Sequence, residues 1–122
     1  MPDNEKLVVM VTHGPEDPEL ATIPFAMAGA AVASDMEVVM GFQGDGCLLV
    51  KKGVAETVHA PEFAPLGELM GTIKELGGEL LVCSPCLKKR GLAQDDLVDG
   101  AEIVAAGRFV AEVASATNSL VY

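Results

Sequence analysis

The run KLVVMVTHG, residues 6–14, decides the fold class of this 122-residue chain. It is an uninterrupted series of apolar, partly β-branched residues that ends at a glycine. Strands that are apolar on both faces are typical of a parallel sheet with a layer of helices on each side. The runs MEVVMGFQ (36–43) and ELLVC (79–83) have the same character. We therefore predict a mainly parallel sheet that contains these three strands.

Segments of helical character separate the strands. Asp17 is a suitable cap before Pro18, and Pro24 interrupts the turns that follow, so we expect the regular helix to begin at Thr22 and to run to Ser34. Gly77 and Gly78 stop the next helix. The remaining elements are expected as a short helical turn at 47–53, a helix at 66–76, a fourth strand at 101–107, a helix at 108–116 and a terminal strand at 119–122.

This alternation of strands and helices predicts an α/β fold. We expect a single domain over residues 1–122, built as a three-layer sandwich: a mainly parallel sheet of about five strands with helices on both faces. Half of the residues are hydrophobic and 4% are aromatic, which suits a core of aliphatic layers.

Charge and composition exclude several classes of function. The net charge of −10 disfavours binding to nucleic acid or to an anionic membrane. The chain begins with the acidic and polar residues MPDNEK and has no apolar run near the ~18 residues that a membrane span requires. Three cysteines do not form an even disulfide framework. We expect a cytoplasmic protein with reduced thiols.

The strand ends indicate where a site would form. In open parallel sheets, working residues gather in loops beyond the carboxyl ends of the strands. All three cysteines fall in this set of loops, which makes the set a candidate site. The pocket candidates in these loops are His13, Gly44, Gly46, Cys47 and Arg108.

The strongest chemical signal is the pair Cys83-Ser-Pro-Cys86. A cysteine at the junction of a strand and a helix meets unpaired N–H groups and the positive end of the helix dipole, which stabilise a thiolate. The cations Lys88, Lys89 and Arg90 follow directly and add positive potential for an anionic sulfur. The spacing leaves open whether Cys83 or Cys86 is the nucleophile.

Other interpretations of these residues carry weight. Cys47 has the character of a buried apolar filler, because free cysteine is among the most buried residue types. A zinc site would have to combine Cys47, Cys83, Cys86 and His13, but a single Cys-x-x-Cys without a second pair disfavours it. We expect neither a metal nor an organic cofactor. The segment Gly44-Asp-Gly46 lacks the spacing of a phosphate-binding loop and is interpreted as a turn.

A set of ordered segments resembles the DsrE/DsrF/TusD family of small sulfur-relay proteins over nearly the whole chain. These segments are VVMVTHGPEDPE, IPFAMAGAAVASDMEV, GFQGDGCLLVKKGVA, PLGELMGTIKELGGELLVCSPCLKKRGL and LVDGAEIVAAGRFVAEVA. The resemblance implies that Cys83 carries a persulfide. It also implies assembly into homo-oligomers, trimers or hexamers, and exchange of sulfur with small sulfur-carrier proteins or rhodaneses. Cys86 departs from the family, which usually has a small residue at this position.

The leading hypothesis is a sulfur-relay protein, a possible sulfurtransferase, that uses Cys83 as its acceptor thiol. On this hypothesis the Cys83 sulfur is reachable and unusually acidic. Because Cys86 would attack a Cys83 persulfide and expel sulfide, a dithiol redox protein that uses both thiols is an alternative. A second alternative is a non-catalytic oligomeric module that binds a small anion. A mean hydropathy of +0.37 independently favours a homo-oligomer.

Overall fold

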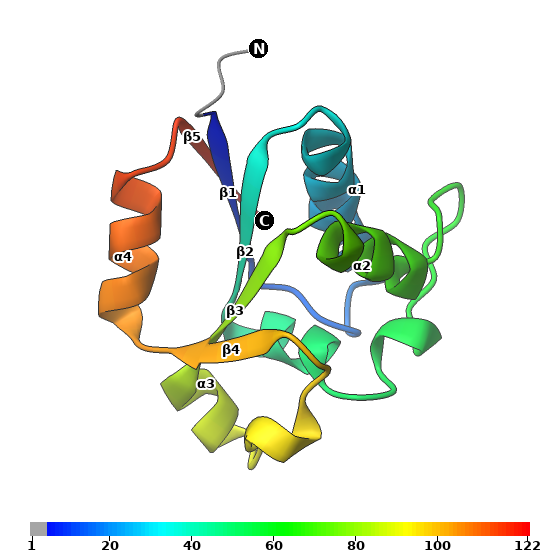
Figure 1. The fold of residues 1–122 in the computed structure, drawn as a ribbon. Coiled ribbons are helices and arrows are strands. Elements are labelled where there is room, and N and C mark those ends of the chain that lie inside the picture. The colour runs from blue at the N-terminus through cyan, green and yellow to red at the C-terminus, as the bar shows by residue number, and fades with distance from the viewer. Residues whose placement is uncertain (1–4) are drawn as a thin grey trace.

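The computed structural model describes residues 5–122 and contains one five-stranded sheet in which every pairing is parallel (Figure 1). In spatial order the strands are β4, β3, β2, β1 and β5. Their bounds are β1 Lys6–Val11, β2 Glu37–Phe42, β3 Glu79–Cys83, β4 Ala101–Val104 and β5 Asn118–Val121. The predicted α/β class and the predicted number of strands are confirmed.

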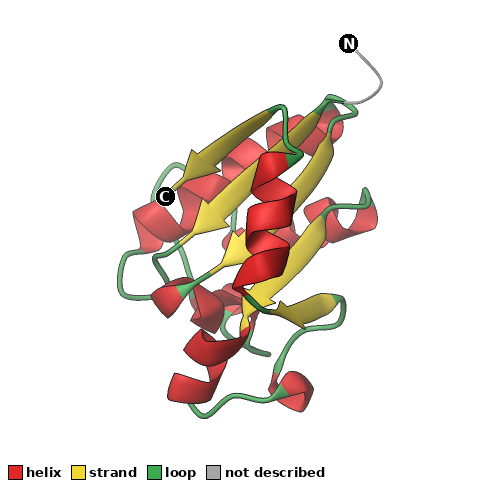
Figure 2. Cartoon of the chain, turned by 90° about the vertical axis from the view of Figure 1, so that its left-hand side faces the viewer, coloured by secondary structure: helices red, strands yellow, loops and turns green. Residues whose placement is uncertain are grey.

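Helices cover the two faces unequally (Figure 2). Helices α1 (Pro18–Ala33) and α2 (Leu66–Glu75) lie on one face, and α4 (Ala106–Ala114) lies on the other. The short helix α3 (Ser84–Lys89) follows β3 directly at the carboxyl ends of the strands. Three 3₁₀ helices complete the described chain: η1 Gly44–Val50, η2 Ala55–Thr57 and η3 Gln94–Asp96. Across residues 5–122, no helix is both long and apolar enough to cross a bilayer.

The strand β1 shows why an uninterrupted apolar run predicts a sheet covered on both sides. All of its residues are buried. Val9 and Val11 belong to the core cluster beneath α1 and α2, whereas Val8 and Met10 belong to the cluster beneath α4. Both sides of this strand therefore need apolar side chains, because successive residues point to opposite faces.

Helix α1 begins at Pro18, so the prediction that it begins at Thr22 is wrong. The Asp17 carboxylate accepts a hydrogen bond from the Leu20 N–H at 3.1 Å, which caps the first turn. Pro24 lies inside the helix and is buried, as is Phe25. The Asp17 cap and the burial of Pro24 thus stabilise the first turns of α1, although Pro24 lacks the N–H that would complete a helical hydrogen bond.

The fourth strand is shorter than predicted. It ends at Val104, and α4 begins at Ala106, whereas the sequence suggested a strand to residue 107. The helical conformation lets Arg108 Nε donate to Glu112 Oε2 at 2.7 Å, four residues ahead. It also buries Phe109 against the sheet. These contacts override the strand-like run AEIVAAG.

An ion pair ties α4 to the start of β1. Lys6 Nζ lies 2.7 Å from Glu112 Oε1, and both side chains are largely shielded from solvent, with 11% and 15% exposure. Hydrogen bonds from Lys6 and then from Arg108 lower the pKa of Glu112. The carboxylate is therefore bound in its charged form.

Replacing Glu112 with glutamine is expected to cost about 1–3 kcal/mol of unfolding free energy at neutral pH, because Lys6 loses its charged partner. The folded pKa of Glu112 is lowered, so its contribution is complete above the unfolded pKa and is lost as the pH falls through the folded pKa. Urea unfolding at neutral and acidic pH measures both effects. Glu102→Gln is the matched control: its exposed carboxylate pairs with Arg108 at 2.9 Å, and its loss should cost under about 1 kcal/mol. Equal losses in the two variants would contradict the prediction.

Candidate functional site: a cluster of three thiols

The three cysteines meet at the carboxyl ends of β2 and β3, and none forms a disulfide. Cys47 lies in η1, Cys83 ends β3, and Cys86 lies in α3. Cys83 and Cys86 each shift the pKa of the other thiol, and Cys47 also shifts the pKa of Cys86. The structure therefore brings Cys47 together with two cysteines that follow it by 36 and 39 residues along the chain.

The start of α3 resolves which thiol occupies the cap. Cys83 is the N-cap residue, with φ −67° and ψ 119°, and Cys86 lies within the first turn. Cys83 is one strand position past Val82, which faces the α1 and α2 side, and two past Leu81, which faces α4. The alternation of side chains therefore directs Cys83 toward the α4 face. Because it ends the strand, it packs both against the cluster on that face and against the larger cluster beneath α1 and α2.

Cys86 is the acidic thiol of the pair. Its partial burial alone favours the neutral form. The neighbouring Cys83 thiol, the hydrogen bond from the Gly44 N–H and the nearby Cys47 thiol outweigh that effect and lower its pKa. The Gly44 nitrogen is 3.3 Å from Cys86 Sγ. The positive charge of Arg90 acts in the same direction. When the pair loses its first proton, the thiolate resides on Cys86.

Cys83 does not show the unusual acidity that we expected from the sequence. Burial, followed by the neighbouring Cys86 thiol, raises the pKa of Cys83. The side chain is half-buried. In its neutral form Cys83 stabilises the neighbouring thiolate, so the two thiols share one proton.

Close backbone packing directs the Gly44 N–H at Cys86. Gly44 adopts a left-handed conformation with φ +54°, which glycine adopts without a steric penalty. A Cβ atom on Gly46 would collide with the carbonyl oxygen of Val11, and one on Gly14 would collide with the carbonyl oxygen of Asp45. Both glycines are therefore required for η1 to lie directly against the end of β1.

Arg90 links η1 to α3 through two hydrogen bonds. Its Nη1 donates to the Cys86 carbonyl oxygen at 3.0 Å, and its Nη2 donates to Asp45 Oδ1 at 2.8 Å. Asp45 was not among the residues singled out from the sequence; its place between Gly44 and Gly46 was the available signal. Lys88 and Lys89 are exposed in the last turn of α3. Of the three predicted cations, Arg90 is the one that contacts the site's backbone.

Cys47 is fully buried. Its thiol donates to the Phe42 carbonyl oxygen at 3.3 Å. Burial, followed by the charges of Cys86 and Cys83, raises its pKa to about 12. Cys47 is thus a neutral, shielded thiol beside the Cys83–Cys86 pair.

An aromatic disulfide reagent is expected to modify two of the three thiols in the folded protein and all three in urea, with Cys47 as the protected one. The raised folded pKa also predicts that Cys47 favours folding at neutral pH. This contribution is lost as the pH rises from the ordinary value of 9.0 toward about 12. Reagent titration with peptide mapping tests the protection, and urea unfolding in alkaline buffers tests the pH effect. Rapid modification of Cys47 without denaturant would contradict both.

The remaining pocket candidates lie in different surroundings. His13 follows β1, and its Nδ1 is 3.1 Å from Glu16 Oε2 at the surface. Glu16 also accepts from the Gly14 N–H at 2.7 Å. Arg108 does not join the thiols: its guanidinium contacts three carboxylates, on Glu79, Glu102 and Glu112. It belongs to the ion-pair network beneath α4.

A metal site requires several donor side chains that lie close together. Within residues 5–122, no three side chains of His, Cys, Asp or Glu are grouped so that they could hold a metal ion. The zinc ligand set considered from the sequence is therefore not assembled in the described part of the chain. The sulfur atoms of Cys86 and Cys47 instead form hydrogen bonds with backbone groups.

Comparison with known proteins gives a family match over residues 5–122, to the model described as the DsrE/DsrF-like family. Uncharacterized protein MJ0989 of Methanocaldococcus jannaschii is 29% identical over 96% of this chain and 99% of its own length. Uncharacterized protein MJ0760 of the same organism is 30% identical over 87% of this chain. The match covers only 38% of MJ0760, so this chain spans well under half of that relative.

Two solved structures share the fold. The YchN protein from E. coli superposes with a TM-score of 0.82 at 18% identity, covering 97% of this chain and 99% of its own. MTH1491 from Methanobacterium thermoautotrophicum superposes with a TM-score of 0.74 at 16% identity, covering 98% and 100%. At these identities the likeness shows a common architecture.

Proposed function

This chain belongs to the DsrE/DsrF-like family, and on that premise we propose that it is a sulfur-relay protein whose Cys83–Cys86 pair takes up a sulfane sulfur as a persulfide. One observation carries the proposal. Cys83 is the N-cap residue of α3 and Cys86 lies in the first turn of that helix with a lowered pKa, so a proton acceptor lies beside the acceptor thiol. A persulfide donor needs a thiolate to attack it, and this pair supplies one.

In the proposed step, the Cys83 proton moves to the neighbouring Cys86 thiolate. Cys83 then attacks the outer sulfur of the donor, the donor's S–S bond breaks, and the donor leaves as a thiolate. Because nucleophilicity rises with thiol pKa, Cys83 is the better nucleophile once deprotonated. Cys86, with the lower pKa, is the group that holds the charge before the proton moves. Release reverses the order: an acceptor thiolate removes the outer sulfur, and Cys83 regains its proton.

The test is to incubate the protein with a sulfane-sulfur donor and to measure the mass of each cysteine-containing peptide. We expect one added sulfur on the Cys83 peptide, absent in Cys83→Ser. Ser119→Ala is the matched control, because this exposed side chain of β5 lies outside the thiol cluster and the variant should load normally. Failure of every donor to add sulfur would refute the proposal.

A dithiol redox protein is the second candidate, and the proximity of the two thiols favours it. The Cys86 thiolate would attack the inner sulfur of a Cys83 persulfide, release sulfide and leave a disulfide. Sulfide release in step with disulfide formation after loading would identify this function. A persulfide that survives until an acceptor thiol is added would identify the relay.

The proposed setting follows from the same chemistry. Both thiols must stay reduced, which fits a cytoplasmic protein. We propose a homo-oligomer, a trimer or hexamer, with a small sulfur-carrier protein or a rhodanese as exchange partner. The mean hydropathy of +0.37 supports contact between copies. Light scattering should give a mass well above the 12.6 kDa of one chain, and a monomer would contradict this part of the proposal.

A further inference from the structure

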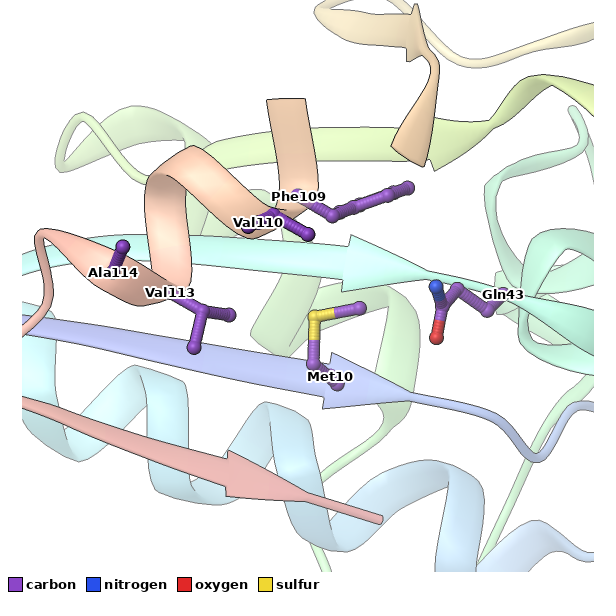
Figure 3. A pocket seen from close by; sticks show the side chains of 6 residues that line it. All are labelled: Met10, Gln43, Phe109, Val110, Val113 and Ala114. Atoms are coloured by element: carbon purple, nitrogen blue, oxygen red, sulfur yellow. The ribbon is translucent and has the colours of Figure 1, made fainter. Parts of the chain in front are cut away.

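An apolar groove lies on the α4 face of the sheet (Figure 3). Its volume is about 350 Å³, within the range of small-molecule sites. Side chains from α4 and from β1 face each other across it, and Gln43 stands at one end. The groove is lined by Met10, Gln43, Phe109, Val110, Val113 and Ala114.

The groove exists because α4 covers only part of this face. Val121 of β5 pairs with Met10 of β1, and strand alternation places both on the α4 side. Val121 is 71% exposed, so the sheet beyond α4 is open to solvent. Gly41 of β2 lies beneath the groove and leaves room for it, because a Cβ there would lie within 2.8 Å of the side chains of Met10 and Phe109. A ligand can therefore enter from the side of β5.

The register of the sheet places the end of this groove beside the thiols. Phe42, the last residue of β2, pairs with Val82 of β3, so Gln43, which follows β2, comes next to Cys83, which ends β3. Gln43 keeps an extended backbone, with φ −132° and ψ 160°. Gln43 and Cys83 both follow the residues that face α1 and α2, so both side chains belong to the α4 side. Cys83 packs against the cluster that contains Met10 and Phe109 and also against the larger cluster on the other face of the sheet.

The lining carries no charged side chain, and its one polar group is the Gln43 amide, at the end next to Cys83. Such a groove suits a ligand whose apolar part lies along α4 and β1 and whose polar group lies at Gln43. A charged body would lose its hydration without gaining a partner. Donors such as inorganic thiosulfate cannot use the groove at all.

From this geometry we propose that the groove binds the apolar body of a low-molecular-mass organic sulfane donor and presents its terminal sulfur to Cys83. The inference rests on the proposed function, since it names the donor class for that thiol. With an alkanethiosulfonate, R–SO₂–S⁻, Cys83 bonds to the terminal sulfur and the S–S bond breaks. The sulfinate R–SO₂⁻ leaves with the bonding electrons, and the proton of the Cys83 thiol ends on the new persulfide.

The test measures the rate constant of persulfide formation on Cys83 with n-alkanethiosulfonates from methane- to hexanethiosulfonate. These donors share one leaving-group chemistry and differ in apolar length. We expect the rate constant per donor concentration to rise roughly three- to fourfold per methylene for the first few carbons, as burial of each methylene predicts. Val110 is 67% exposed, so Val110→Asp should fold and should abolish this dependence. Leu76→Asp, at an exposed apolar position at the end of α2, should preserve it.

Each outcome decides one question. Equal rate constants for methane- and hexanethiosulfonate in the wild type would overturn the inference and leave the proposed function standing. If none of the donors forms a persulfide on Cys83, the proposed function itself is refuted. If Val110→Asp slows all donors equally and reduces the mass by light scattering, the groove is an interface between copies, and the inference is overturned. A length dependence lost in Val110→Asp and kept in Leu76→Asp supports it.

Discussion

Replacing Gly46 with alanine is expected to lower the free energy of unfolding by about 3 kcal/mol and to raise the pKa of Cys86. The new Cβ would collide with the carbonyl oxygen of Val11 and lie 2.8 Å from its carbonyl carbon. Val11 ends a strand that is paired on both sides, so it cannot move aside. The start of η1 must shift instead, and Gly44, two residues earlier, shifts with it.

The loss of the Gly44 N–H is what couples this substitution to the thiol. That N–H lies 3.3 Å from Cys86 Sγ and is one of the groups that stabilise the thiolate. Urea unfolding measures the stability, and the pH dependence of Cys86 alkylation measures the acidity. Gly71→Ala is the matched control: it lies in α2 with no atom near the new Cβ and should gain about 0.5–1 kcal/mol. An unchanged alkylation profile in Gly46→Ala would contradict the role assigned to the glycine loop.

The Cys86→Ser substitution is expected to slow persulfide formation on Cys83 at neutral pH by a factor on the order of 10². Serine keeps the size of the side chain but cannot hold the negative charge near neutral pH. Cys83 then ionises without a proton acceptor beside it. Because burial is the first cause of its raised pKa, that pKa should stay above the ordinary value of 9.0.

The pH profile separates this role from a structural one. In the wild type the pair supplies a thiolate at a pH below the ordinary thiol pKa, because the pKa of Cys86 is lowered. In Cys86→Ser the rate should recover as the pH rises above about 9, where solvent removes the Cys83 proton. Cys83→Ser should form no persulfide at Cys83 at any pH. A rate that stays low in alkaline Cys86→Ser would show that the substitution damaged the fold.

Much of the architecture was predictable from the chain alone. The strands at β1, β2 and β3 were located because a strand buried on both faces requires consecutive apolar residues, and such runs are visible without any partner. The two corrections share one cause. Pro24 inside α1 and Phe109 in α4 are both buried by other parts of the chain, and local propensity contains no record of that burial.

The thiol site was predictable in its location but not in its electrostatics. Strand ends place Cys83 and Cys86 together because they are neighbours along the chain. The groups that make Cys86 the acidic member include an N–H from residue 44 and the thiol of Cys47. Nothing in the Cys-x-x-Cys spacing reports which sulfur these groups reach. Dipole arguments applied to the sequence alone therefore leave the choice of thiolate open.

The sequence by itself determined the α/β class, the parallel sheet and the gathering of the three cysteines at one edge, because periodicity and the order of strands and helices can be read along the chain. Only the tertiary structure decided that Cys86 is the thiol with the lowered pKa and that Gln43, at the end of an apolar groove, comes next to Cys83. Both outcomes depend on sheet register and close backbone packing, which bring residues together through space rather than along the chain.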